Sequence, residues 1–335
     1  MPDPHTAAAD APPAATPGDA PEAAATLAEL RRGLSSVVVG QDAAVEQVLI
    51  ALLAGGHALL EGVPGTAKTL MVKALARLLS ADFGRVQFTP DLMPADIVGT
   101  NVFDLSNQAF RLHRGPIFTD LLLGDEINRA PAKTQSALLE AMAERRVTID
   151  GVSHELPPLF SVFATQNPVE FEGTYPLPEA STDRFLLKIR LGYPSADAER
   201  RVLAAVDRGE SLDTTGLDAL EPVTDAAGVL AARAQLAGVR TDDAVTDYLL
   251  KLVRATREEP RLLMGAGPRG AIDLLKAAKA RAMLAGRGYV TPDDVAEVLV
   301  PVLGHRVVLS AEAEVGGDTA EDALLAVADG VDVPR

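Results

Sequence analysis

The strongest constraint on the fold is a glycine-rich loop that stands between a short apolar run and a helical pattern. The loop reads Gly62-Val63-Pro64-Gly65-Thr66-Ala67-Lys68-Thr69. The run Ala58-Leu59-Leu60 before it predicts a buried strand, and the residues after it recur on one helical face at Met71, Leu75, Leu78 and Leu79. In that setting the backbone N–H groups of the loop and the helix N-terminus can hold a phosphate. The sequence therefore predicts a P-loop.

Short apolar runs and helical patterns alternate along the first part of the chain. Further apolar runs lie at 86–88, 121–123, 160–164 and 185–191, and helical patterns separate most of them. A helix also precedes the P-loop, with Asp42 as its expected N-cap and one apolar face made by Val45, Val48, Leu49 and Leu52. This alternation predicts an α/β fold with a mainly parallel sheet covered by helices on both faces.

The pattern changes after Gly192-Tyr193-Pro194-Ser195. Beyond this break the periodicity predicts mostly helices, at 196–206, 225–236, 242–258, 268–285 and 292–300. We therefore expect an α/β nucleotide-binding domain over 25–192 and a smaller all-helical domain over 193–335. Residues 1–24 are mostly Ala, Pro, Asp and Glu, so they are expected to form a disordered tail with too little apolar surface to fold.

Charge and residue usage argue against several classes of function. The formal net charge is −16 and aromatic residues make up 4% of the chain, which is a poor match for nucleic acid. The absence of cysteine excludes disulfides and thiolate metal sites, and the five histidines show no metal-binding spacing. No apolar run approaches the roughly 18–20 residues that span a bilayer. Without a signal-peptide pattern, a cytoplasmic location is expected.

Three residues at the end of the loop have distinct predicted roles. Lys68 would neutralise charge on the β- and γ-phosphates as a point cation, and the Thr69 hydroxyl would ligate Mg²⁺. Ala67 occupies a position where the usual pattern has glycine. If the backbone there needs a positive φ, alanine costs on the order of 1–2 kcal/mol.

Polar side chains also follow two later apolar runs. Leu121-Leu122-Leu123-Gly124 leads into Asp125 and Glu126, which predicts a strand that ends in two carboxylates. Asp125 would hold Mg²⁺ through water, and Glu126 would polarise the attacking water. Asn167 follows the run at 160–164, where a side chain reaches the ligand-binding edge of a parallel sheet. It could position the lytic water or the γ-phosphate, although an asparagine before a proline also fits an ordinary turn.

Two arginines are candidates for stabilising charge on a departing phosphoryl group. Arg184 directly precedes the predicted strand at 185–191, and Arg269 follows Gly267-Pro268 at the start of a predicted helix. An arginine finger contributes about 10³–10⁵ in rate. For both residues, a surface or salt-bridging role is an open alternative.

Taken together, these motifs resemble the MoxR-type AAA+ ATPases of bacteria. The resemblance extends from about residue 30 to the end of the chain. It rests on Val39-Gly40-Gln41, 56–65, 87–96, the run Asp125-Glu126-Ile127-Asn128-Arg129-Ala130-Pro131-Ala132-Lys133-Thr134-Gln135, Gly267-Pro268-Arg269 and His305-Arg306.

The resemblance implies an AAA+ core with a helical lid, and it assigns roles to the residues that match. ATP would bind at residues 62–69 and Leu70, with Lys68 and Thr69 in Walker A. Asp125 and Glu126 would form Walker B, and Asn167 would be sensor 1. Arg269 would act in its own subunit as sensor 2, and Arg184 would act on a neighbouring subunit as the arginine finger.

The resemblance also implies partners. It suggests a homo-oligomer, expected to be a hexameric ring, with ATP between subunits and two hairpins facing the pore. One hairpin would lie within 91–115, carrying Phe103 and Phe110, and the other at 145–157. Chaperone-like remodelling of a protein client is implied, with a partner that carries a von Willebrand factor A domain. A nucleic-acid motor and a nucleotide-sensing scaffold with little turnover are the alternatives.

Overall fold

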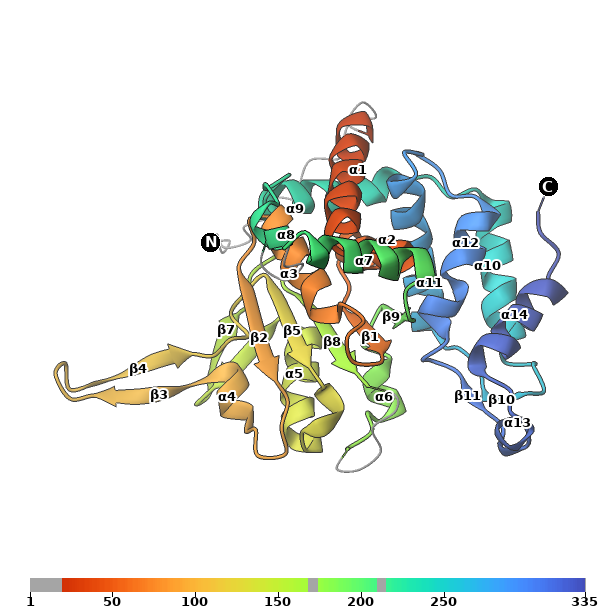
Figure 1. Cartoon of the computed structure of the whole chain (residues 1–335). Coiled ribbons are helices and arrows are strands. Elements are labelled where there is room, and N and C mark those ends of the chain that lie inside the picture. Colours follow the sequence, from red (N-terminus) through yellow and green to blue (C-terminus); the bar gives the residue numbers. More distant parts are fainter. Residues whose placement is uncertain (1–19, 168–173, 210–214, 335) are drawn as a thin grey trace, which may run out of the picture.

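The protein folds around a five-stranded parallel sheet that helices cover on both faces (Figure 1). The computed structural model describes residues 20–167, 174–209 and 215–334. In spatial order the strands are β2 (Phe83–Gln87), β5 (Leu121–Asp125), β8 (Ser161–Gln166), β1 (Ala58–Gly62) and β9 (Leu187–Leu191). The predicted α/β class is confirmed.

Strand β1 shows why the sheet is covered on both sides. Successive residues of a strand point to opposite faces. Ala58 and Leu60 belong to one apolar core, which also contains side chains of α1 (Ala20–Val37), α2 (Asp42–Leu53) and α3 (Lys68–Leu78). Leu59 belongs to a second core, with side chains of α5 (Ala132–Glu144). The parallel strands thus bring all their carboxyl ends to one edge of the sheet, where ligand sites form in such folds.

Two β-hairpins extend from this core. The first follows α4 (Pro94–Val98) and consists of β3 (Gly99–Asp104) and β4 (Ala109–Arg114), which project far from the sheet in Figure 1. Phe103 and Phe110 face each other across it with ring centroids 5.2 Å apart. The second consists of β6 (Arg146–Ile149) and β7 (Val152–Glu155). Both hairpins lie within the segments that the family resemblance implies.

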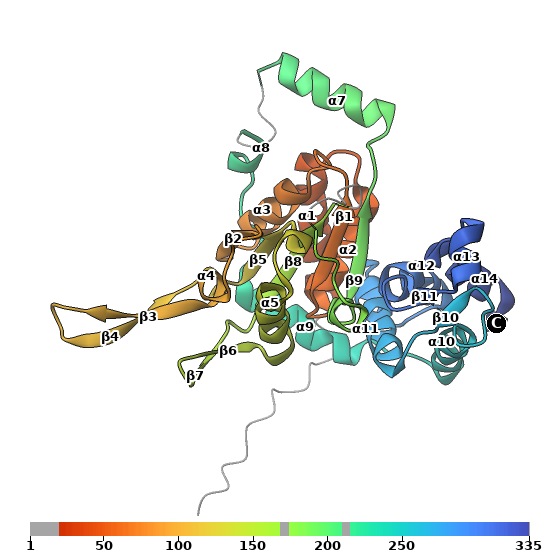
Figure 2. The same cartoon turned by 90° about the horizontal axis from the view of Figure 1, so that it is seen from below.

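The segment after β9 crosses the α/β core before it enters the lid. It contains α7 (Ala196–Asp207), α8 (Thr215–Asp218) and α9 (Ala226–Gln235). Figure 2 shows α7 set apart from the sheet, whereas α9 packs on α2. Arg233 of α9 donates to the Leu52 carbonyl at 2.8 Å and to Ser161 Oγ at 3.0 Å. The helical region that begins at residue 193 is therefore partly attached to the α/β core.

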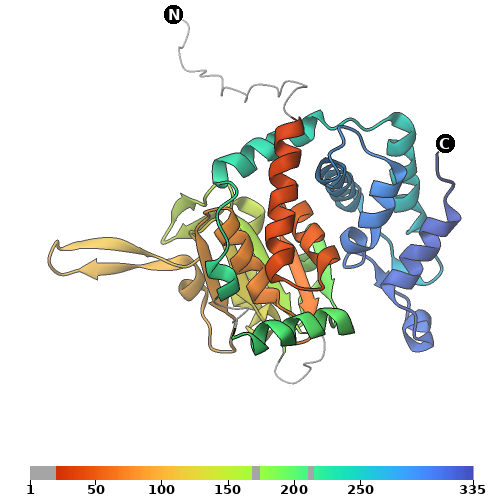
Figure 3. The ribbon, with the colours of Figure 1, turned by 45° about the horizontal axis from the view of Figure 1, so that its top comes forward.

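The lid itself lies beside the sheet (Figure 3). Its helices are α10 (Asp243–Ala255), α11 (Pro268–Leu284), α12 (Pro292–Leu303), α13 (Ala311–Gly316) and α14 (Ala320–Gly330), with a small antiparallel pair made by β10 (Leu262–Met264) and β11 (Val308–Leu309). Helix α11 packs on α1 and α2, and α12 packs on β9. One continuous apolar core therefore joins the lid to the α/β domain.

Two predictions near the N-terminus need correction. Helix α1 begins at Ala20, so the expected tail over 1–24 is too long at its end, and its residues 1–19 lie outside the described part of the chain. The reason is that alanine is a strong helix former and that Ala23 and Leu27 are buried against the core. Asp42 is the first residue of α2, and Gln41 occupies the N-cap position. Within residues 20–167, 174–209 and 215–334, no helix is both long and apolar enough to cross a bilayer.

Candidate nucleotide-binding site

The P-loop connects the end of β1 to the start of α3 and depends on two left-handed residues. Gly65 has φ +83° and Ala67 has φ +63°. A Cβ on Gly62 would lie 2.5 Å from the Leu191 carbonyl oxygen, so only glycine fits there. Ala67 therefore has the positive φ at which alanine, unlike glycine, is strained. This strain costs on the order of 1–2 kcal/mol. The loop thus holds a conformation that its sequence does not favour locally, which is frequent at functional sites.

The Lys68 side chain folds back over the loop. Its ammonium group donates to the Gly62 carbonyl and, at 3.2 Å, to the Val63 carbonyl. Thr66 Oγ1 also donates to the Val63 carbonyl, at 2.9 Å. A cation is therefore held over the concave side of the loop, at the N-terminus of α3, where an anion is favoured.

The two acids after β5 are held by side chains from the neighbouring strands. Asp125 is buried, and its carboxylate accepts from Thr165 Oγ1 at 2.7 Å and from the Arg85 guanidinium at 2.7 Å. Thr165 Oγ1 in turn accepts the Glu126 backbone N–H at 2.8 Å. This fixes the peptide that joins the acids, where Glu126 has φ +56°.

The Glu126 carboxylate has its own partners. Its Oε2 accepts from Gln87 Nε2 at 2.9 Å and from Arg129 Nη1 at 3.1 Å. Gln87 and Arg85 lie on β2 at i and i+2, so they point to the same face of the sheet. Both acids are therefore restrained from the same edge strand.

A cavity of about 1080 Å³ brings these groups together. From the predicted site it is lined by residues 64–70, Asp125, Glu126 and Asn167. Asn167 lies one residue past β8 and is buried. The volume of the cavity suffices for a nucleotide, because pockets for ligands of that size are about 300–1000 Å³.

Sequence reasoning missed the other walls of this cavity. They come from the end of α1, the loop before α2, strand β8, the loop after β9, and α7 with the turn that follows it. The residues are Val37, Val39, Gln41, Thr165, Tyr193, Pro194, Glu199, Val202, Leu203, Val206 and Gly209. Gln41 is fixed there by a 2.8 Å bond from its Nε2 to the Gly192 carbonyl. The signal that could have pointed to α7 is its apolar residues, among them Leu203 and Val206, which stay exposed on an otherwise polar helix. Exposed apolar residues on such a helix indicate a surface that contacts a ligand or another chain.

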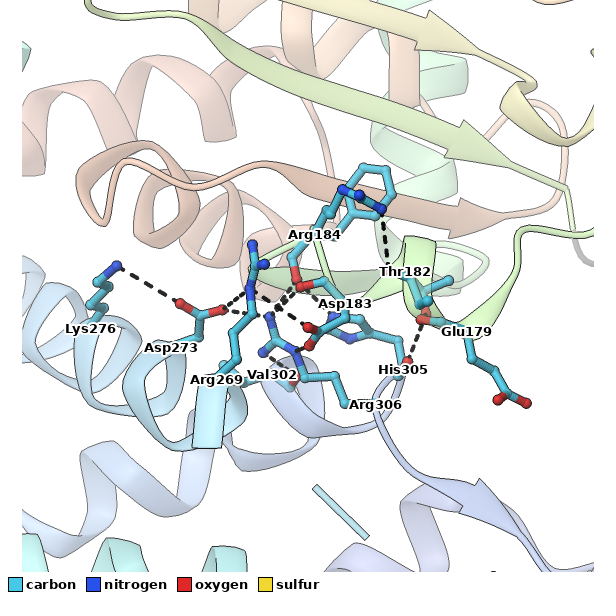
Figure 4. A network of polar contacts seen from close by, with 12 residues as sticks. Glu179, Thr182, Asp183, Arg184, Arg269, Asp273, Lys276, Val302, His305 and Arg306 are labelled. Carbon is cyan, nitrogen blue, oxygen red and sulfur yellow. Dashed lines mark hydrogen bonds and ion pairs between the residues drawn. The ribbon is translucent and has the colours of Figure 1, made fainter. Parts of the chain in front are cut away.

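The two candidate arginines do not line the cavity. Arg184 is partly exposed and donates from Nη1 to the Ala180 carbonyl at 3.3 Å. Arg269, at the start of α11, lies with Nε 3.7 Å from Asp183 Oδ2 and 3.9 Å from Asp273 Oδ2. Both lie in a polar network between α6 (Glu179–Thr182) and the lid (Figure 4).

Arg306 is the centre of that network, and sequence reasoning gave it no role. It is 7% exposed, and its guanidinium donates to Asp183 Oδ1 at 3.0 Å and to Asp273 Oδ2 at 2.6 Å. Burial raises the pKa of Asp273, while the charges of Arg306, Lys276 and Arg269 oppose that shift. Burial lowers the pKa of His305 to about 3, so its ring is neutral where it contacts the Phe185 carbonyl at 2.8 Å.

The donor set of the cavity fits Mg²⁺. Thr69 and Asp125 both line it, and hydroxyl, carboxylate and water oxygens are the ligands that Mg²⁺ prefers. The Asp125 carboxylate is already fixed in orientation by Thr165. A hydrated cation beside Thr69 would therefore meet a preoriented oxygen.

Comparisons with known proteins agree with this geometry. Residues 57–187 match the ATPase family associated with various cellular activities (AAA), and residues 254–326 match the AAA lid domain. The chain is 46% identical over 301 residues to protein YeaC of Bacillus subtilis, spanning 90% of this chain and 92% of that one. It is 44% identical over 316 residues to chaperone MoxR1 of Mycobacterium tuberculosis, spanning 89% and 81% respectively. The crystal structure of a candidate ATPase from Cytophaga hutchinsonii has a TM-score of 0.86 at 39% identity, covering 95% of this chain and 97% of that one.

A P-loop beside two strand-end acids, on a parallel sheet joined to a helical lid, defines an ATPase of the AAA class. Within that class, protein MoxR of Paracoccus denitrificans is 36% identical over 310 residues, which span 85% of this chain and 89% of that protein. The chain belongs to the MoxR family of AAA+ ATPases.

Proposed function

We propose that this protein hydrolyses ATP at the cavity beside the P-loop. The observation that carries the proposal is the convergence of Lys68, at the start of α3, with Asp125, Glu126 and Asn167, at the ends of β5 and β8, on one cavity. Lys68 binds the β- and γ-phosphates, which replace the loop carbonyls as its partners. Thr69 and Asp125 hold Mg²⁺, which neutralises charge on the phosphates.

Glu126 is the group that activates water in this proposal. Its carboxylate lies at the end of β5, at the edge of the sheet where the phosphates would bind, and Asn167 lies at the same edge after β8. Glu126 accepts a proton from the attacking water, and the Asn167 amide orients that water or the γ-phosphate. A site that only bound nucleotide would need no carboxylate there, which favours turnover over a sensing scaffold.

Arg184 and Arg269 complete the proposal from outside the cavity. Arg269 acts in its own subunit once the lid closes, and Arg184 acts on the nucleotide of a neighbouring subunit. A guanidinium supplied in this way is worth about 10³–10⁵ in rate. The proposed active form is therefore a homo-oligomer, a hexameric ring on the family resemblance, with α7 and the P-loop at the subunit boundary.

The biological role we propose is chaperone-like remodelling of a protein client in the cytoplasm. Its support is the MoxR resemblance, the similarity to chaperone MoxR1, and the projecting hairpin, which exposes Phe110. The net charge of −16 favours a protein client over nucleic acid. A von Willebrand factor A domain protein as partner rests on the resemblance alone.

The test is a Glu126→Gln variant, with Glu140→Gln as the matched control on the exposed face of α5. Because glutamine keeps the shape and the hydrogen bonds but cannot take a proton, phosphate release should fall by at least about 100-fold. Binding of a fluorescent ATP analogue should persist. Unchanged phosphate release in Glu126→Gln would show that Glu126 is not the catalytic acid–base group, and strong stimulation of wild type by DNA at physiological salt would favour a nucleic-acid motor.

A further inference from the structure

The residues on both sides of Arg184 are anchored to the end of the lid helix α12. Arg306 Nη2 donates to the Asp183 carbonyl at 3.4 Å and to the Phe185 carbonyl at 2.8 Å. His305 adds a contact from Nε2 to the same Phe185 carbonyl at 2.8 Å, and its own carbonyl accepts from Thr182 Oγ1 at 3.0 Å. The backbone that carries Arg184 is thus attached to the lid by both polar residues that follow α12.

Arg306 also reaches α11, the helix whose second residue is Arg269. Its Nη2 is 2.6 Å from Asp273 Oδ2, and Asp273 lies one turn after Arg269 on α11. Nη1 donates to the Val302 carbonyl at 2.9 Å. All three guanidinium nitrogens of Arg306 are therefore engaged, and they join α11, the end of α12 and the segment 183–185.

Arg184 and Arg269 are held far more loosely than Arg306. Arg269 is 52% exposed and approaches Asp183 and Asp273 only at 3.7 and 3.9 Å. The Arg184 guanidinium points away from Asp273 in Figure 4 and donates to the Ala180 carbonyl at 3.3 Å. Long, exposed ion pairs contribute at most about 1 kcal/mol. Both side chains can therefore change partner, while the buried Arg306 stays in place.

We propose that Arg306 is a positioning residue that couples the lid of one subunit to the catalytic finger which that subunit offers to its neighbour. When Arg269 turns toward the nucleotide of its own subunit, Asp183 and Asp273 lose one of their two guanidinium partners. Arg306 remains on both carboxylates, so the segment that carries Arg184 moves with the start of α11. Nucleotide in one site thereby sets the position of the finger in the next. This inference rests on the proposed roles of Arg184 and Arg269.

The experiment is subunit mixing with two variants of the network. Arg306→Lys keeps the charge that Asp273 requires but cannot reach acceptors on three elements at once. Asp183→Asn keeps the size of a side chain that is 39% exposed, so it tests the same link if the buried substitution unfolds the protein. Each variant alone should lose about 10- to 100-fold in kcat, as expected for a misplaced catalytic group. Affinity for a fluorescent ATP analogue should stay within about two-fold, because neither residue lines the cavity.

Mixing each variant with Glu126→Gln distinguishes a finger effect from structural damage. Glu126→Gln subunits have no catalytic base but carry an intact network and finger. In a random equal mixture, about one quarter of the interfaces combine an intact Glu126 with an intact finger, so that fraction of wild-type activity should return. Arg184→Ala mixed with Glu126→Gln is the positive control, and Arg269→Ala mixed with Glu126→Gln should stay inactive, since Arg269 acts in its own subunit.

The outcomes separate the inference from the proposal beneath it. The coupling is supported if mixing with Glu126→Gln restores activity to Arg184→Ala and also to Arg306→Lys or Asp183→Asn. Restoration for Arg184→Ala but for neither network variant overturns the inference and leaves the ring ATPase standing. Failure of Arg184→Ala to be restored removes the trans role of Arg184, and the coupling with it.

Discussion

His57 gives the structure a measurable sensitivity to acid. His57 directly precedes β1 in the sequence, and its ring is fully buried. Its Nδ1 accepts the Val162 N–H at 2.9 Å, and its Nε2 lies 3.2 Å from the Met142 carbonyl. An Nδ1 that accepts must be unprotonated, so the ring is the neutral Nε2–H tautomer. Burial, and after it the positive charges of Arg145 and Arg233, lower the pKa of His57 to about 3.

The size of the effect follows from the difference between the two pKa values. In the unfolded chain His57 titrates near 6.5, so between pH 6.5 and 3 the unfolded state binds a proton that the folded state does not. Stability must therefore fall as the pH drops through this window, by about 1.4 kcal/mol per pH unit. Between pH 7.5 and pH 5 the loss from this one residue is about 2 kcal/mol.

The assay is urea unfolding at both pH values for wild type, His57→Asn and His113→Asn. Asparagine can replace the two hydrogen bonds of the ring but has no titrating group, so the loss of unfolding free energy between the two pH values should shrink by about 2 kcal/mol. His113, exposed on β4, is the matched control and should leave that difference unchanged. If His57→Asn loses as much stability between pH 7.5 and 5 as wild type does, His57 is not a buried neutral group in the folded protein.

Two further predictions concern the site. Ala67→Gly should raise the free energy of unfolding by up to about 1 kcal/mol in the same urea assay, because relief of the left-handed alanine outweighs the entropy of glycine; a destabilised variant would contradict this. Arg85→Gln should lower the Mg²⁺ concentration for half-maximal binding of an ATP analogue by about two- to five-fold, because Asp125 no longer shares its charge with a guanidinium. Arg111→Gln on the exposed hairpin is the control, and a higher Mg²⁺ requirement in Arg85→Gln would instead show that Arg85 orients Asp125.

The parts of the site that the sequence predicts are those encoded by short, continuous segments. The residues of the loop 62–69 are enough to predict that it binds phosphate. Each apolar run that becomes a parallel strand ends at the same edge of the sheet. For that reason Asp125 and Asn167, 42 positions apart in the sequence, could be placed on one site from periodicity alone. The lid helices α10, α11 and α12 are likewise local patterns and lie where they were expected, whereas the two hairpins were expected from the family resemblance.

What the sequence does not reveal is which distant side chains share a polar contact. Asp183 and Arg306 are 123 residues apart, and each could equally have been a surface charge on its own segment. Helix α7 was found as a helix, but its packing against the P-loop cavity depends on the path of the chain after β9. Periodicity describes a face of a helix, and only the fold decides what that face meets.

The contacts of the candidate catalytic groups link the fold to the proposed turnover. Lys68 is bound to loop carbonyls, Asp125 to Arg85 and Glu126 to Gln87 and Arg129. Each of these groups therefore has a polar partner within the chain, and phosphate, Mg²⁺ or water bound in the cavity would compete with that partner. This competition would occur at the carboxyl edge of the sheet, but the two arginines that would complete the site are held at the lid. In the proposed ring ATPase, nucleotide would therefore bind within one subunit, whereas turnover would also require the lid and the neighbouring subunit.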